Sequence, residues 1–284
     1  MNNPLIRKGW LRALIFLVIW VFLQMGVTKI LFKLLSPFTQ KGDQTDPAMS
    51  LLLVGFLSFL TSVPAVVIFR KLVDRKTVLS LGFDWNGNSK HAWTGFFCAI
   101  FILSAGTLLI VLTGNLSFIA FDFYWQDLML YVLVMLFVAI AEELVIRGYI
   151  LNNLLESFPK WIALLISASL FGLLHLLNPD FNWLSMIVIF IGGLALGINY
   201  IYTKNLWFGI FFHFAWNFFQ GPIFGYKVSG LETDSLLAQN INGPVWLTGG
   251  PFGFEASALA SLLILLVFVY LAFYYKRNEH AFLR

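Results

Sequence analysis

Long apolar runs, each about 20 residues long and separated by polar or Pro-containing breaks, fill the chain from end to end. A helix needs about 20 apolar residues to cross a bilayer. The runs therefore predict an all-α integral membrane protein, a bundle of about eight transmembrane helices forming one domain over residues 1–284. The predicted spans cover residues 11–36, 48–69, 93–114, 126–150, 160–178, 183–202, 205–224 and 256–275. The longest break, rich in Gly and Pro, is the connection 227–255.

Basic residues sort to one side of the predicted membrane. With the N-terminus in the cytoplasm, fourteen of the 18 Lys and Arg residues fall on the inner side and four on the outer side. This asymmetry follows the positive-inside rule and predicts a multi-pass protein with cytoplasmic N- and C-termini. The inner set is Arg7, Lys8, Arg12, Arg70, Lys71, Arg75, Lys76, Lys90, Arg147, Lys160, Lys204, Lys276, Arg277 and Arg284, and the outer set is Lys29, Lys33, Lys41 and Lys227.

The composition points to a lipid environment. The chain is 60% hydrophobic and 11% charged, whereas soluble domains carry about 25% charged residues. The formal net charge of +4 forms no patch, because the basic residues fall between the apolar runs. We therefore expect the lipid bilayer as a partner and no nucleic acid. The first run is longer than the apolar region of a signal peptide and predicts a retained helix. Short termini suit a bacterial plasma-membrane protein.

Three charged residues interrupt the run 126–150. Glu142, Glu143 and Arg147 lie at its end, and charges at membrane depth mark functional sites by default. Residues four apart share a helix face, so we expect Glu143 to pair with Arg147. Glu142 lies about 100° around the helix from Glu143 and about 140° from Arg147. Glu142 is therefore the carboxylate left free to act as a general base.

Further polar residues lie within other apolar runs. His175 lies within the run 160–178, and His213 and Asn217 lie four residues apart within the run 205–224. If the turn between runs 126–150 and 160–178 centres near Pro159, Glu142 and His175 lie at similar depth, since a helix rises about 1.5 Å per residue. Gly193 and Gly197 form a small-xxx-small pattern that favours close helix packing.

This set of side chains suits hydrolysis. Glu142 and His175 could activate a water, and His213 and Asn217 could donate hydrogen bonds to a developing oxyanion. Alternatively, Glu142, His175 and His213 could bind Zn²⁺ and leave one position open for water. The His-Glu-x-x-His signature is missing from the chain, so we expect no cofactor.

Three motifs follow one another on separate predicted helices: Glu-Glu-x-x-x-Arg at 142–147, Phe-x-x-x-His at 171–175 and His-x-x-x-Asn at 213–217. In this order they resemble the CPBP (Abi) family of intramembrane proteases, which includes type II CAAX prenyl endopeptidases and bacterial relatives linked to bacteriocin processing and self-immunity. The resemblance covers about 125–220, a catalytic core. It implies that Glu142 and His175 activate water, that His213 and Asn217 form the oxyanion site, and that Glu143, Arg147 and Phe171 support them.

The leading hypothesis is thus an intramembrane endopeptidase that hydrolyses a peptide bond in a membrane-associated peptide or protein. The resemblance also allows zinc at Glu142, His175 and His213, although a metal-free reaction is expected. A non-catalytic membrane partner or immunity protein of the same fold is the alternative. A proton- or ion-coupled transporter is a third reading, since membrane-embedded Glu and His also serve relays, but no inverted repeat supports it.

Overall fold

The computed structural model describes residues 3–41 and 44–279. Helices dominate these residues, and four short strands lie between them. The α-helices are α1 (Gly9–Phe22), α2 (Lys29–Leu35), α3 (Pro47–Ile68), α4 (Ser89–Leu112), α5 (Trp125–Glu143), α6 (Asn152–Leu154), α7 (Lys160–Leu174), α8 (Trp183–Thr203), α9 (Trp207–Phe218), α10 (Val245–Thr248) and α11 (Ala258–Arg277). The strands are β1 (Gln40–Lys41), β2 (Gln44–Thr45), β3 (Leu116–Phe121) and β4 (Leu237–Ile241).

Wider π-helical turns extend or join several of these helices. They cover Leu23–Thr28, Phe69–Val73, Leu144–Leu151 and Phe219–Ile223. Single 3₁₀ turns cover Ser36–Thr39, Val78–Leu81, Gly250–Phe252 and Phe254–Ala256. Because the first π-helical turn joins α1 to α2, and the third joins α5 to α6, each of these pairs reads as one long helix.

Every apolar run of the sequence forms a helix, which confirms the prediction of an all-α membrane protein. Within the described residues, six helical stretches are long and apolar enough to cross a membrane: Gly9–Thr39, Pro47–Val73, Ser89–Leu112, Trp125–Leu154, Trp183–Thr203 and Ala258–Arg277. The runs 160–178 and 205–224 form the shorter helices α7 and α9. The multi-pass class is therefore clear, and a count of eight spans stays a prediction.

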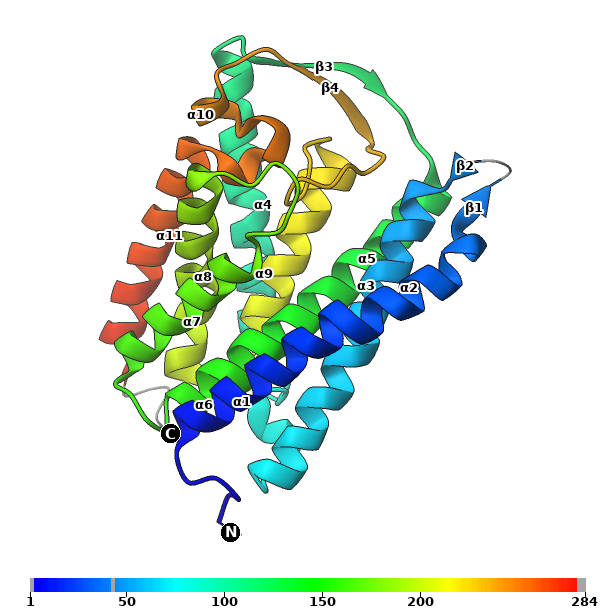
Figure 1. The fold of residues 1–284 in the computed structure, drawn as a ribbon. Coiled ribbons are helices and arrows are strands. Elements are labelled where there is room, and N and C mark those ends of the chain that lie inside the picture. The colour runs from blue at the N-terminus through cyan, green and yellow to red at the C-terminus, as the bar shows by residue number, and fades with distance from the viewer. Residues whose placement is uncertain (1–2, 42–43, 280–284) are drawn as a thin grey trace.

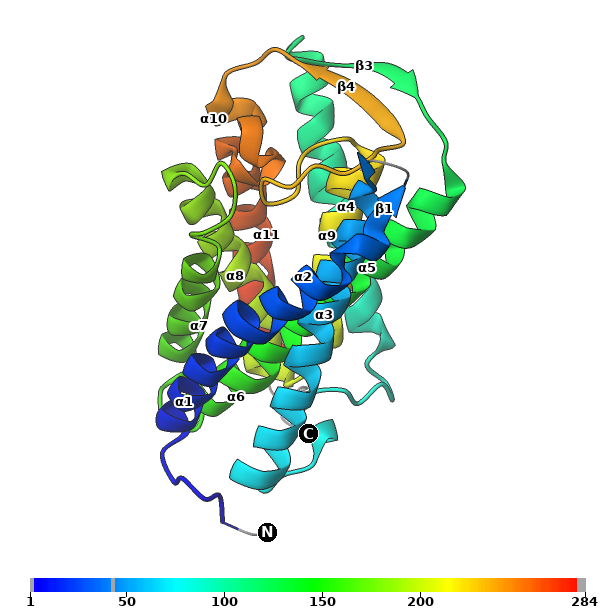
Figure 2. The ribbon, with the colours of Figure 1, turned by 45° about the vertical axis from the view of Figure 1, so that its right-hand side comes forward.

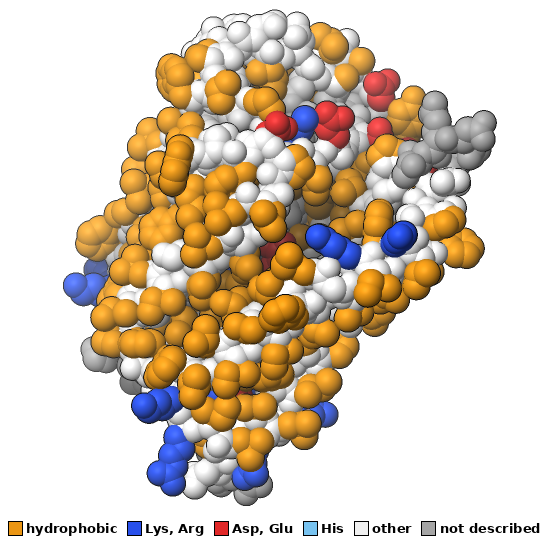
Figure 3. Space-filling model, in the orientation of Figure 1, with side chains coloured by type: hydrophobic (Ala, Val, Ile, Leu, Met, Phe, Trp, Pro, Cys, Tyr) orange, Lys and Arg blue, Asp and Glu red, His pale blue; other side chains and the backbone are white. Residues whose placement is uncertain are grey.

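The helices pack as two groups that meet at α5 and α9. Helices α1, α2, α3 and α5 lie together, and α4, α8, α9 and α11 form the other group, with α7 against α8 (Figures 1 and 2). The beginning of α1 and the end of α11 lie at the same end of the bundle (Figure 1). Hydrophobic side chains cover most of the face shown in Figure 3, with basic groups at this end.

Side-chain caps and Pro residues fix where several helices begin. Asp46 precedes Pro47 and accepts a hydrogen bond from the Met49 N–H at 3.0 Å. Asn182 and Ser185 form a reciprocal capping box at the start of α8. Such caps satisfy amide groups that have no partner within the helix. The cap at Asn182 thereby fixes the end of the short connection between α7 and α8.

An antiparallel ribbon that the apolar pattern did not predict crosses the opposite end of the bundle. Strand β3 pairs with β4, with Leu116 opposite Ile241 and Phe121 opposite Leu237 (Figure 1). Strand β4 belongs to the connection 227–255, which the sequence presented as a long break. Its partner strand, β3, lies more than a hundred residues earlier in the chain, so the local sequence pattern does not predict the pairing.

Three arginines of the predicted inner set are buried inside the bundle, and the side of the membrane on which they lie stays a prediction. Arg12 Nη1 lies 3.5 Å from Asp74 Oδ1, and Arg70 Nη1 lies 2.8 Å from Asp74 Oδ2. Arg12, Arg70 and Asp74 are each at most 2% exposed. Asp74 also accepts a hydrogen bond from the Tyr149 hydroxyl at 3.1 Å. The third arginine, Arg147, is 1% exposed. A buried carboxylate holds each of these cations, so they do not mark a surface. Arg284 lies outside the described residues.

We expect Asp74→Asn to lower the free energy of unfolding by about 3 kcal/mol or more, because the buried Arg70 guanidinium loses the carboxylate that it pairs with and Arg12 keeps only Glu156. Thermal unfolding in detergent measures this loss. The matched control is Asp122→Asn, at an exposed position, which should stay within about 0.5 kcal/mol. Equal melting temperatures for the two variants would contradict the anchoring role of Asp74.

Candidate active site

Glu143 and Arg147 form a buried ion pair at the end of α5. Arg147 Nη1 lies 2.6 Å from Glu143 Oε1, which confirms the predicted pairing. Arg147 Nη2 donates to the Gly193 carbonyl of α8 at 3.2 Å. The guanidinium carbon lies 4.4 Å from the centre of the Phe171 ring of α7, a cation–π contact. The pair therefore joins α5 to both α7 and α8.

His213 of α9 continues this network. Its Nδ1 lies 3.1 Å from Glu143 Oε1, and because the partner is a carboxylate, Nδ1 carries the proton. Glycine at position 209 makes the approach feasible, since a Cβ there would lie 2.6 Å from Glu143 Oε2. Sequence reasoning missed Gly209, because its role depends on a helix more than sixty residues away.

Close packing of α7 against α8 also depends on glycine. A Cβ at Gly193 would lie 3.0 Å from Ala168 Cα and Cβ, and one at Gly197 would lie 2.5 Å from Leu164 Cδ1. These contacts confirm the packing role predicted for the two glycines. They also let the Gly193 carbonyl reach Arg147.

His175 does not lie inside a helix, as the run 160–178 suggested. It follows the last residue of α7 and caps the helix end. Its Nδ1 lies 2.8 Å from the carbonyl oxygen of Phe171, and because a carbonyl can only accept, Nδ1 must donate. This assignment leaves Nε2 facing the site. The Phe171 and His175 rings meet edge to face, with centroids 4.8 Å apart.

Glu142 faces both histidines. Its Oε2 lies 4.0 Å from His175 Nε2 and 3.9 Å from His213 Nε2, and it has no hydrogen-bond partner within the described residues. These separations are too long for direct hydrogen bonds but suit a bridging water. The Glu142 side chain is 30% exposed, whereas Glu143 is fully buried. The structure thus separates the two glutamates in the way the helix geometry predicted.

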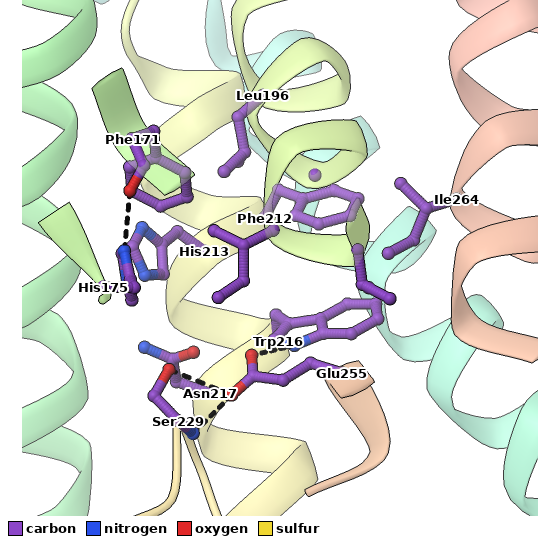
Figure 4. A pocket seen from close by; sticks show the side chains of 13 residues that line it. Phe171, His175, Leu196, Phe212, His213, Trp216, Asn217, Ser229, Glu255 and Ile264 are labelled. Atoms are coloured by element: carbon purple, nitrogen blue, oxygen red, sulfur yellow. Dashed lines mark hydrogen bonds between the residues drawn. The ribbon is translucent and has the colours of Figure 1, made fainter. Parts of the chain in front are cut away.

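Two cavities meet at Phe171 and His175. The first, here called the histidine chamber, has a volume of about 60 Å³ and is lined by both site histidines and Asn217 (Figure 4). The second, the glutamate chamber, has a volume of about 230 Å³ and is lined by Glu142, Trp20 and Gln24. Taken together, the two chambers are lined by Phe171 and by the four predicted catalytic residues, Glu142, His175, His213 and Asn217.

The structure adds residues that the sequence analysis did not select. Glu255 lies in the 3₁₀ turn Phe254–Ala256, and its carboxylate lines the histidine chamber with Ser229 and Trp216 (Figure 4). Burial raises the pKa of the Glu255 carboxyl, while hydrogen bonds from Ser229 oppose that rise. Both Glu255 and Ser229 come from the Gly- and Pro-rich connection. A carboxylate in such a segment reads as an ordinary loop residue.

The donor atoms as placed do not make a three-ligand zinc site. Zinc binds such donors at about 2.0–2.2 Å, which would hold neighbouring ligand atoms roughly 3.4 Å apart in a tetrahedron. Glu142 Oε2 is 3.9–4.0 Å from the two histidine nitrogens. Across residues 3–41 and 44–279, no group of three or more His, Cys, Asp or Glu side chains is arranged to hold a metal ion.

Part of the chain matches a known protein family. Residues 124–219 match the family described as type II CAAX prenyl endopeptidase Rce1-like. The match confirms the resemblance to CPBP-family intramembrane proteases, and it includes every residue of the three motifs. It supports a protease of the CAAX type in general. No curated protein and no solved structure matches the chain.

We expect Gly209→Ala to lower the free energy of unfolding by about 1–3 kcal/mol, the usual effect of overpacking. The added methyl must displace a carboxylate that Arg147 and His213 hold. Gly192→Ala is the matched control, because it also lies within a helix and a Cβ there meets nothing within 4 Å. Thermal unfolding compares the two variants. If they are equally stable, the Glu143 carboxylate does not occupy the space beside Gly209.

Proposed function

We propose that this protein is an intramembrane endopeptidase in which Glu142 and His175 activate the attacking water, and His213 and Asn217 stabilise the oxyanion. The observation that carries the proposal is the position of Glu142 Oε2, 4.0 Å from one histidine Nε2 and 3.9 Å from the other. A water that bridges Glu142 and His175 would lie beside the cavity where His213 and Asn217 face a substrate.

The first step is attack on the carbonyl carbon of a peptide bond. Glu142 takes one proton from the water while the water oxygen bonds to the carbon, and the His175 Nε2 lone pair orients the water through its second hydrogen. His213 lies between Glu143 at Nδ1 and Glu142 at Nε2. With a proton on each nitrogen it can donate from Nε2 to the oxyanion, and the Asn217 amide adds a second donor.

The second step breaks the carbon–nitrogen bond. Glu142 returns its proton to the departing amine nitrogen, so that the products are a carboxylic acid and an amine and the enzyme groups regain their original state. Glu143 and Arg147 touch no reacting atom in this scheme. They hold the His213 ring and the Phe171 ring, and they position the residues that carry out the chemistry.

The surroundings favour a substrate that is itself membrane-associated. Trp20, Met25 and Leu177 line the glutamate chamber, so an apolar peptide or protein segment suits it better than a soluble chain. The matched family is described as a prenyl endopeptidase, and a prenylated protein is one substrate of this class. We further propose that the enzyme is a plasma-membrane protein with both termini in the cytoplasm.

We expect Glu142→Ala and His175→Ala each to reduce cleavage by about 10³-fold or more, because each removes a group that activates the water. Purified protein in proteoliposomes, incubated with a library of peptides that carry an apolar anchor, gives the readout by mass spectrometry. Glu232→Ala is the control, since this carboxylate is 80% exposed in an outer connection. Retained cleavage in both site variants would refute the mechanism.

The alternative is a non-catalytic membrane partner or immunity protein of the same fold. In that case the Glu142→Ala and His175→Ala variants would complement a deletion strain as well as the unmodified protein does. Failure of both variants to complement, with normal abundance in the membrane, favours the enzyme. The alternative keeps its place because a bundle can bind a partner through surfaces far from Glu142.

We expect the reaction to be metal-free, so cleavage should change by less than about twofold after incubation with 1,10-phenanthroline or EDTA. The wide spacing of the donors around Glu142 motivates this expectation, since zinc needs neighbouring ligand atoms closer together. A loss greater than about tenfold that Zn²⁺ alone restores would show that the site closes around a metal.

A further inference from the structure

Glu255 is a buried carboxylate at the wall of the histidine chamber. The residue is 8% exposed. Its Oε1 accepts hydrogen bonds from the backbone N–H and the hydroxyl of Ser229, the latter at 2.9 Å, and its Oε2 accepts from the Trp216 indole N–H at 3.3 Å. Figure 4 shows the carboxylate between these donors, on the side of the chamber away from Phe171. Three groups therefore orient the carboxylate at the cavity.

No Lys or Arg in the described part of the chain balances this carboxylate. His175, which interacts with it electrostatically, is neutral in the proposed reaction, and the protonated His213 is paired with Glu143. Within the described residues, no ion pair involves Glu255, and the arginine nearest to the site chemistry, Arg147, is bound to Glu143. A carboxylate can accept about four hydrogen bonds, and three neutral donors leave it with acceptor capacity. Burying a charge without a counter-charge is costly. The chamber therefore favours a ligand that brings a positive charge to Glu255.

The rest of the chamber suits an alkyl chain. Apolar side chains of three helices line it: Val188, Ile189 and Leu196 of α8, Phe212 of α9 and Ile264 of α11. Its volume of about 60 Å³ would hold about four to six water molecules, at roughly 10–15 Å³ each. A lysine side chain, with four methylene carbons and one nitrogen, displaces a similar number of atoms.

We propose that the histidine chamber binds a cationic side chain of the substrate, lysine by size, next to the cleaved bond, and that Glu255 is its counter-ion. This inference rests on the proposed protease function, because His175, His213 and Asn217 line the same chamber. Ser229 and Trp216 are positioning residues for the carboxylate. The substrate ammonium completes its hydrogen bonds and neutralises its charge.

A purely structural role for Glu255 makes a different prediction. The carboxylate also ties the turn at Ser229 to α9, and Ser229 adopts a left-handed backbone conformation with φ of 51°. If this tie were its whole role, removing the charge would affect all substrates alike. A binding role affects cationic substrates alone, so the ratio between two substrates separates the two roles.

The first experiment measures the substrate preference of the unmodified protein. In a cleaved peptide, each position within four residues of the cleaved bond is replaced in turn by Lys, Arg, Glu or norleucine, which keeps the alkyl chain without the charge. At one position, kcat/KM for Lys should exceed that for norleucine by about 10- to 100-fold, the usual effect of a hydrogen-bonded charge. N-acetylated peptides report the side chain, and peptides with a free N-terminus report the terminal amine. No preference for Lys at any position would overturn the inference.

The second experiment changes the carboxylate. Glu255→Gln should reduce the Lys-to-norleucine ratio to about one, whereas the matched variant Glu232→Gln should leave the ratio as in the unmodified protein. A ratio that persists in Glu255→Gln would overturn the assignment of Glu255. If that variant does not fold, Ser229→Ala replaces it, since loss of the hydroxyl donor should lower the ratio in the same direction.

A binding measurement separates this inference from the proposed function. The Glu142→Ala variant, reconstituted in nanodiscs, is titrated with the N-acetylated Lys and norleucine peptides by microscale thermophoresis. If the Lys peptide binds tighter by about tenfold or more but the unmodified protein does not cleave it, the protease function is refuted and the cation site is supported. Cleavage without any preference for the charged peptide, in binding or in turnover, would refute the cation site and support the protease function.

Discussion

The ion pair between Glu143 and Arg147 connects the helices that form the site. The guanidinium contacts the Gly193 carbonyl of α8 and the Phe171 ring of α7, and the carboxylate contacts His213 of α9. Loss of either partner would leave the other charge buried without compensation. Glu142, His175 and His213 can share one small volume because this pair fixes α5, α7, α8 and α9 relative to one another.

Local rules were sufficient for the parts of the site that depend on one helix or one hairpin. The spacing of Glu143 and Arg147 predicted their pairing, and the hairpin register predicted that Glu142 and His175 would meet. The apolar runs predicted the helices themselves, since burial in lipid imposes a length that the sequence displays directly. Each of these inferences needs only the geometry of a helix.

Features that depend on contacts between distant segments were beyond that reasoning. Gly209 makes room for Glu143, Asp74 draws Arg12 and Arg70 inward, and Glu255 reaches the chamber from a Gly- and Pro-rich connection. The local sequence does not distinguish any of these residues, because the residues that each of them contacts lie far away along the chain. The end of α7 before His175 is a further case, since the apolar run continues beyond it.

The walls of the histidine chamber come from two different stretches of the chain. The residues that would carry out hydrolysis lie within 124–219, the stretch that matches the protease family, whereas Ser229 and Glu255 lie beyond it. Chemistry and substrate choice would then be encoded separately. Substitutions in the later stretch could redirect the enzyme to new targets during evolution, or in the laboratory, while the groups that break the bond stay as they are.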